Sequence, residues 1–157
     1  MAIEIERKYL VKDDSWRDYI ISSTEIIQGY LCSNSRCEVR VRVRKDKNIQ
    51  AAWMTAKSTG ACVERIEVER DICIEDAKRL LALSDSVVSK VRHLVLIGDL
   101  AFEVDEYTGD NKGLIVAELE VYSADFAFEK PLWLGEEVTT NIKYRNSQLA
   151  KNPYSKW

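Results

Sequence analysis

Residues 38–44 carry the clearest structural signal in this chain, because charged and apolar side chains alternate there: Glu38-Val39-Arg40-Val41-Arg42-Val43-Arg44. Alternation with a period of two is typical of a β-strand, whose successive side chains point to opposite faces of a sheet. The valines therefore belong to one face and the charged residues to the other. Polar residues at 45–48 follow directly, as expected for the turn of a hairpin.

The same alternation recurs in seven further segments, at residues 3–11, 26–31, 49–57, 63–72, 87–97, 100–107 and 114–121. Helical spacing instead marks three short stretches, at residues 15–21, 75–83 and 139–149. Short turns join most consecutive strands, which favours antiparallel pairing, and eight antiparallel strands can close on themselves. We therefore expect a β-dominated α+β fold: a closed eight-stranded antiparallel β-barrel with a few peripheral helices and a C-terminal helix.

Length and composition predict one globular domain spanning residues 1–157. The chain is 46% hydrophobic and holds only two prolines and six glycines, too few chain breakers for a disordered protein. Its 23 basic and 26 acidic residues give a net charge of −3. This balance argues against a nucleic-acid or membrane-surface binder, which would carry a basic excess.

The sequence also predicts a cytoplasmic protein with free thiols. Its longest stretch without charged residues, 26–35, is too short to cross a bilayer, and no export signal is visible. The four cysteines form no C-x-x-C pair and the chain has a single histidine, so the spacing gives no support to a zinc site.

Like-signed pairs two residues apart recur on the charged face of the predicted strands, as in Arg40 and Arg42, or Glu118 and Glu120. Such pairs lie about 7 Å apart and repel each other unless an opposite charge is bound. One interpretation is a solvated face with weak surface ion pairs. The other is a wet tunnel, in which basic residues hold a polyanion such as a polyphosphate and carboxylates hold Mg²⁺ or Mn²⁺. Periodicity alone leaves both interpretations open.

The N-terminal residues Glu4-Ile5-Glu6-Arg7-Lys8 resemble the E-x-E-x-K signature of the CYTH superfamily, the triphosphate tunnel metalloenzymes. The resemblance continues in order through Gln28-Gly29-Tyr30-Leu31, Arg40-Val41-Arg42, Thr55-Ala56-Lys57, Arg65-Ile66-Glu67-Val68-Glu69, Lys90-Val91-Arg92, Glu103-Val104-Asp105 and Glu118-Leu119-Glu120. Residues 133–146 are similar to the C-terminal segment that borders the tunnel in compact bacterial members. The resemblance implies a single CYTH domain with the triphosphate tunnel fold, a closed eight-stranded barrel.

The resemblance also implies roles for the charged residues. The triphosphate would be held by Lys8, Arg40, Arg42, Lys57, Lys90 and Arg92. The metal, Mg²⁺ or Mn²⁺, would be held by Glu4, Glu6, Glu67, Glu69, Glu103, Asp105, Glu118 and Glu120. The catalytic residues would be Glu4, Glu6, Lys8 and Lys90. Arg44 has no clear counterpart in the family's pattern.

The function implied is metal-dependent hydrolysis of a linear triphosphate, with inorganic tripolyphosphate cleaved to pyrophosphate and phosphate. The alternatives on the same fold are a nucleoside or thiamine triphosphatase and an adenylyl cyclase. An alternative from another class is a non-catalytic polyphosphate-binding module, but it would not need carboxylate pairs on several strands. The expected partner is thus a small polyphosphate, with no nucleic acid and no membrane, and the oligomeric state is not predicted.

Overall fold

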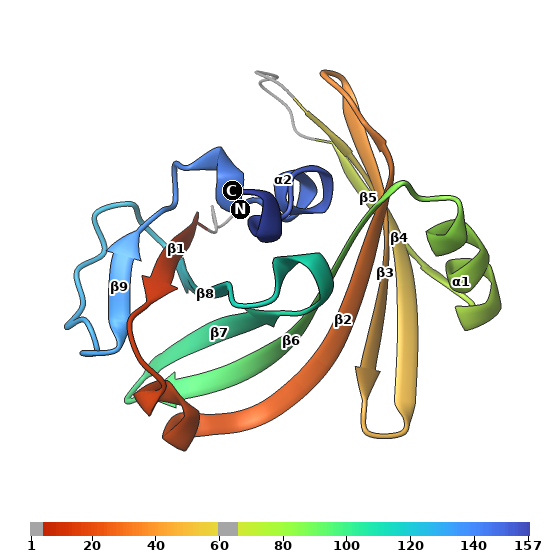
Figure 1. Ribbon diagram of the computed structural model, residues 1–157. Helices are drawn as coiled ribbons and strands as arrows, with labels where there is room; N and C mark the ends of the chain where they lie inside the picture. The colour runs from red at the N-terminus through yellow and green to blue at the C-terminus, as the bar shows by residue number, and fades with distance from the viewer. Residues whose placement is uncertain (1–4, 60–65) are drawn as a thin grey trace.

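The computed structural model of the chain, which describes residues 5–59 and 66–157, is built mainly of strands (Figure 1). They are β1 (Ile5–Val11), β2 (Ile20–Ser33), β3 (Cys37–Asp46), β4 (Ile49–Ser58), β5 (Glu67–Ile72), β6 (Ser86–Ile97), β7 (Leu100–Tyr107), β8 (Ile115–Val121) and β9 (Leu134–Glu137). The α-helices are α1 (Ile74–Ala82) and α2 (Asn146–Lys151). Short 3-10 helices are η1 (Ser15–Tyr19), η2 (Gly109–Asn111), η3 (Ile142–Tyr144) and η4 (Tyr154–Lys156).

The strands form a nine-stranded sheet in the order β5-β4-β3-β2-β6-β7-β8-β1-β9, and every neighbouring pair is antiparallel. Figure 1 shows the sheet strongly curved, with α2 inside the curve and α1 outside it. We call the side that faces α2 the concave face. Within the described ranges, edge strand β5 pairs only with β4 and edge strand β9 only with β1.

The predicted β-dominated, antiparallel fold is confirmed, and each of the eight predicted segments contains a strand. The predicted strand count is wrong, because β9 adds a ninth strand. This strand is only four residues long, too short to show a period in the sequence. It pairs with β1 through Tyr9 opposite Glu137 and Val11 opposite Leu134, so tertiary contact rather than local pattern defines it.

The helix predictions have mixed outcomes. The helix expected at 75–83 is confirmed by α1. The one expected at 15–21 is confirmed in part: a five-residue 3-10 helix, η1, spans Ser15–Tyr19, and β2 already begins at Ile20. Trp16 of η1 is completely buried against the sheet. The helix expected at 139–149 is divided into η3 and the six-residue α2.

Apolar side chains pack mainly on the convex face of the sheet. Phe102 and Val104 of β7 are buried there with Trp16, and Val41 of β3 is buried beneath Ala77 of α1. Because side chains alternate between the faces, the charged residues between these positions point to the concave side. Of the two interpretations left open by the sequence, the structure supports the one with an inward charged face.

No helix in the two described stretches combines the length and the apolar character needed to cross a membrane.

Candidate active site

A cavity of about 900 Å³ lies on the concave face of the sheet. Its wall consists of Glu6, Lys8, Tyr30, Glu38, Arg40, Arg42, Lys57, Ser58, Thr59, Ile66, Glu67, Arg92, Glu118, Thr139, Arg145, Asn146 and Ser147. Glu67 belongs to β5, the first strand in the sheet order, whereas Glu6 belongs to β1, the last but one. The sheet therefore curves far enough for nearly opposite ends of its strand order to share one cavity.

Most of the cations predicted from the sequence lie on this wall, together with three of the predicted carboxylates. They are Lys8, Arg40, Arg42, Lys57, Arg92, Glu6, Glu67 and Glu118. The wall does not include the predicted residues Lys90, Glu69, Glu103, Asp105 and Glu120. Glu4, predicted as both catalytic and metal-binding, lies outside the described residues.

The arginines of β3 present donors that the protein leaves partly unsatisfied. Arg42 Nε donates a hydrogen bond to Gln28 Oε1 at 2.8 Å, and Gln28 in turn donates to Tyr30 Oη at 2.5 Å. Arg40 Nε is buried without a hydrogen-bond partner in the described part of the chain. In that same part, no salt bridge joins Arg40 or Arg42 to a carboxylate. Burial, together with the charges of Arg40 and Arg92, lowers the pKa of Arg42. Such a cluster favours the binding of an anion.

Glu118 of β8 connects two cations on the opposite part of the wall. Its carboxylate lies 3.0 Å from Lys8 Nζ and 3.0 Å from Arg92 Nη2, and Lys8 Nζ is also 3.4 Å from Glu6. Burial lowers the pKa of Lys8, but the charges of Glu118 and Glu6 outweigh burial and raise it overall. Lys8 is therefore held as an ammonium group facing the cavity.

Asp105 lies behind the wall rather than on it. It is fully buried, and its oxygens accept hydrogen bonds from Arg92 Nε at 2.7 Å and Arg92 Nη2 at 2.8 Å, and from the equally buried Lys90. Burial raises the pKa of Asp105, but Lys90 and Arg92 outweigh burial and lower it overall. Asp105 thereby fixes the guanidinium of Arg92, which contacts the cavity.

Carboxylates gather around a second, smaller cavity of about 200 Å³, lined by Glu6, Glu103, Glu118 and Glu120 with Leu94 and Ala101. Oxygen ligands of this kind are those that Mg²⁺ and Mn²⁺ prefer. In residues 5–59 and 66–157, no group of three or more acidic, cysteine or histidine side chains is arranged to hold a metal ion alone. Magnesium is commonly bound by one or two carboxylates, with substrate phosphates and water completing its shell. The donor chemistry therefore fits a divalent cation bound together with a phosphate ligand.

The side of the cavity formed by β3, β4 and β5 carries its own ion pair. Lys57 Nζ lies 3.3 Å from Glu38, and Thr55 Oγ1 donates to Glu69 at 2.8 Å. Lys57 is directly opposite Glu67 in the register of β4 and β5.

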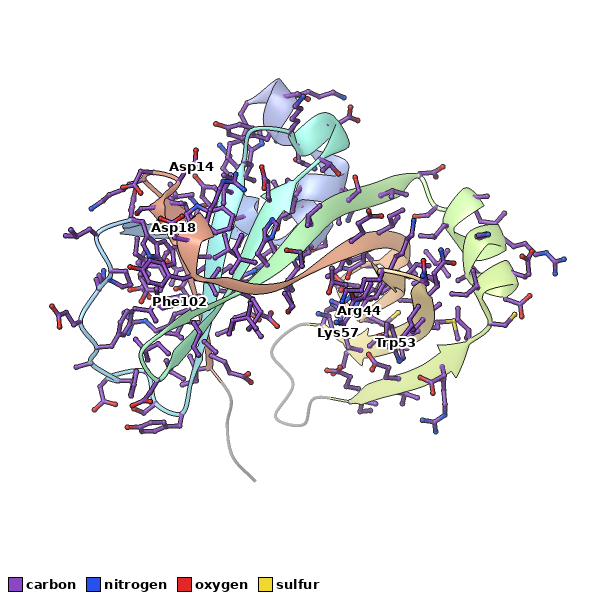
Figure 2. The ribbon with its side chains drawn as sticks, turned by 90° about the horizontal axis from the view of Figure 1, so that it is seen from below. Asp14, Asp18, Arg44, Trp53, Lys57 and Phe102 are labelled. Atoms are coloured by element: carbon purple, nitrogen blue, oxygen red, sulfur yellow. The ribbon has the colours of Figure 1, made fainter. Side chains whose placement is uncertain are left out.

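Figure 2 shows Arg44, Trp53 and Lys57 grouped in this part of the molecule, away from Phe102. The guanidinium of Arg44 lies 5.9 Å from the Trp53 ring centre, and Arg44 is absent from the wall.

Sequence reasoning missed several wall residues. Glu38 follows the same alternation as Arg40 and Arg42, so this signal was present. Arg145 and Asn146 were not predicted as site residues, although the resemblance places residues 133–146 at the border of the tunnel, and no alternation marks them. They reach the cavity because α2 packs on the concave face, where Tyr107 Oη donates to Asn146 Oδ1 at 2.7 Å.

Comparison with known proteins gives consistent matches over almost the whole chain. The profile of the CYTH domain family matches residues 2–153. An inorganic triphosphatase of Acetivibrio thermocellus is 36% identical over 156 residues, which cover 98% of this chain and 97% of that protein. One of Nitrosomonas europaea is 34% identical over 152 residues, with 94% and 96% covered. A crystal structure of an inorganic triphosphatase superposes with a TM-score of 0.74 at 33% identity, covering 96% of this chain and 95% of that one.

Proposed function

Because this chain belongs to the CYTH domain family, we propose that it is an inorganic triphosphatase that hydrolyses tripolyphosphate to pyrophosphate and phosphate. The observation that carries the proposal is that Arg40 and Arg42 share one cavity with carboxylates. In the described ranges neither arginine forms a salt bridge with a carboxylate, so both are available to an anionic substrate. Full-length similarity to inorganic triphosphatases supports the same activity.

The basic residues of the wall bind and orient the substrate. Arg40 and Arg42 lie two residues apart on one face of β3, so their guanidinium groups grip successive phosphoryl groups. Lys57 and Arg92 contact the same chain of phosphates from β4 and β6. Their charges also stabilise the negative charge that develops on the transferred phosphoryl oxygens.

Lys8 and Lys90 have different roles in this proposal. Lys8 lies on the cavity wall, where it would contact a phosphoryl oxygen directly. Lys90 is buried and, among the described residues, is linked to the site through Asp105, which holds Arg92. We therefore assign Lys90 and Asp105 to positioning Arg92, rather than to contact with substrate or metal.

The acidic residues would hold the metal and orient the attacking water. Glu6, Glu118 and Glu120, with Glu4 as predicted from the sequence, would hold Mg²⁺ or Mn²⁺ beside the phosphates, and Glu103 lines the same small cavity. When bound, the ion neutralises phosphate charge and favours ionisation of water. Glu67 lines the main cavity on its β5 side, with Glu69 on the same strand, and would accept a hydrogen bond from the attacking water.

Three further expectations stay predictions. Closure of the sheet into a barrel is supported by the cavity that Glu67 and Glu6 share across the strand order. One domain spanning residues 1–157 is supported by the family match over residues 2–153. A cytoplasmic location rests on the sequence alone.

The proposed activity is tested by offering tripolyphosphate, ATP and thiamine triphosphate separately with Mg²⁺ or Mn²⁺ and identifying the products. We expect tripolyphosphate to be the preferred substrate and to give equal amounts of pyrophosphate and phosphate, and we expect EDTA to stop the reaction. Binding of tripolyphosphate without turnover would instead support a non-catalytic module. Preferred cleavage of ATP or thiamine triphosphate, or formation of cyclic AMP, would support the corresponding alternative enzyme.

A further inference from the structure

Two cysteines face each other across the β2–β3 hairpin, outside the residues that line the cavity. Cys32 is the penultimate residue of β2 and Cys37 is the first residue of β3. Their sulfur atoms lie 3.8 Å apart in a hydrogen bond, and both side chains are partly exposed as free thiols. The remaining cysteine of the described residues, Cys73, is at the start of α1 on another part of the sheet.

The turn between the two cysteines is organised by Asn34, which contacts both of them. Asn34 Oδ1 accepts hydrogen bonds from the backbone N–H groups of Arg36 at 2.8 Å and Cys37 at 3.0 Å. Asn34 Nδ2 lies 3.2 Å from Cys32 Sγ, to which it donates, and Asn34 N donates to the carbonyl of Cys37 at 3.0 Å. The Asn34 side chain therefore links the Cys32 thiol to the backbone of Cys37.

The same turn is bonded to the wall of the cavity. The Thr59 hydroxyl donates to the carbonyl of Asn34 at 2.7 Å, and Thr59 N donates to the carbonyl of Arg36 at 3.0 Å. Thr59 lines the cavity, as does Glu38, which directly follows Cys37 and pairs with Lys57 at 3.3 Å. A change in the turn is therefore transmitted to the wall.

We propose that Cys32 and Cys37 form a reversible intramolecular disulfide on reaction with a small disulfide such as oxidised glutathione. One cysteine thiolate attacks oxidised glutathione, forms a mixed disulfide and releases one reduced glutathione. The second thiolate then attacks the mixed disulfide at the protein sulfur and releases the other. The protein loses two electrons and two protons, and the two glutathione molecules carry them as thiols.

Bond formation requires a local movement at the end of the hairpin. The sulfur atoms must approach from 3.8 Å to the bonded distance of about 2.05 Å. Because Asn34 and Thr59 connect this turn to the cavity, the movement displaces Thr59 and Glu38. The hydrogen bond shared with Cys37, together with burial, raises the pKa of Cys32, so oxidation is faster at pH 8.5 than at pH 7.

The test uses the full chain carrying Cys62→Ser and Cys73→Ser, so that only the pair remains. After treatment with oxidised glutathione at pH 8.5, free thiols are alkylated and peptides are mapped by mass spectrometry. We expect Cys32 and Cys37 to escape alkylation because a disulfide joins them in one cross-linked species. Dithiothreitol should reduce this disulfide and remove the cross-link. The matched variant with Cys32→Ser added should give only a glutathione adduct on Cys37. Alkylation of both cysteines, or stable single adducts without a cross-link, would overturn the proposal.

The coupling to the cavity is measured in the same preparations and rests on the proposed function. We expect the oxidised protein to change KM for tripolyphosphate by at least about twofold, with recovery after reduction. A variant that carries both Cys32→Ser and Cys37→Ser, and so forms neither the disulfide nor a glutathione adduct, should show no change. A cross-linked protein with unchanged KM would overturn the coupling. The peptide map needs no activity, so it decides the disulfide even if the chain does not hydrolyse tripolyphosphate.

Discussion

Replacing Glu118 with glutamine is expected to lower kcat/KM for tripolyphosphate by at least about a hundredfold while leaving the protein folded. Glu118 is buried, faces both cavities, and holds Lys8 and Arg92, each at 3.0 Å. Glutamine keeps the shape of the side chain but removes its charge, so both cations lose a partner and the metal loses a ligand. Lys8 retains Glu6, and Arg92 retains Asp105, which preserves the fold. Initial rates and thermal melts measure the two effects.

The matched control is Glu129→Gln, which removes one negative charge from an exposed residue that borders neither cavity. It should keep the activity of the unchanged protein. Equal losses in the two variants would mean that net charge rather than position matters. An unfolded Glu118→Gln protein would mean that Glu118 is chiefly structural, contrary to the proposed site.

Arg42→Lys is expected to lower kcat/KM for tripolyphosphate by roughly tenfold to a thousandfold, equivalent to about 1.4 to 4 kcal/mol of transition-state stabilisation. The substitution keeps the charge but loses the planar fork that binds two phosphate oxygens. It also removes the Nε hydrogen bond to Gln28 at 2.8 Å, which fixes the direction of the side chain. The measurement is steady-state kinetics with Mg²⁺ and tripolyphosphate.

Arg44→Lys provides the matched control on the same strand and the same face. Arg44 is exposed, lies over Trp53 and does not line the cavity, so the variant should retain nearly full activity. If Arg42→Lys kept its kcat/KM while Arg44→Lys lost most of it, the substrate would lie further along β3 than proposed. If neither variant changed kcat/KM, β3 would not bind the triphosphate.

The face of each strand was predictable from the sequence, whereas the depth of each side chain was not. Alternation assigns Lys90 and Arg92 to one face, and Asp105 to the same face of the neighbouring strand. Only tertiary packing then determines that Lys90 and Asp105 are buried whereas Arg92 faces the cavity. Lys90 and Asp105 lie opposite Tyr107 and Val116 in the strand register, in the region that α2 covers, and so are buried. Arg92, two residues further along β6, remains open to the cavity.

The ends of the chain's regular elements were the least predictable part of the fold. Strand β9 has four residues, and its pairing with β1 depends on partners far away in the sequence. Arg145, which directly precedes α2, lines the cavity, and α2 lies inside the curve of the sheet (Figure 1). Neither feature leaves a period in the local sequence, since both arise from long-range packing.

The most direct test of the concave cavity as the triphosphate site is the melting temperature of the protein with and without ligand. A ligand that binds only the native state must raise the melting temperature, and saturating Mg²⁺ with tripolyphosphate should raise it by roughly 5 to 10 °C. Mg²⁺ alone should have a smaller effect, because phosphate oxygens complete the metal's shell. The same ligands should shift Arg42→Lys less than the unchanged protein. No shift at saturating metal and tripolyphosphate, or an equal shift in Arg42→Lys, would contradict the account.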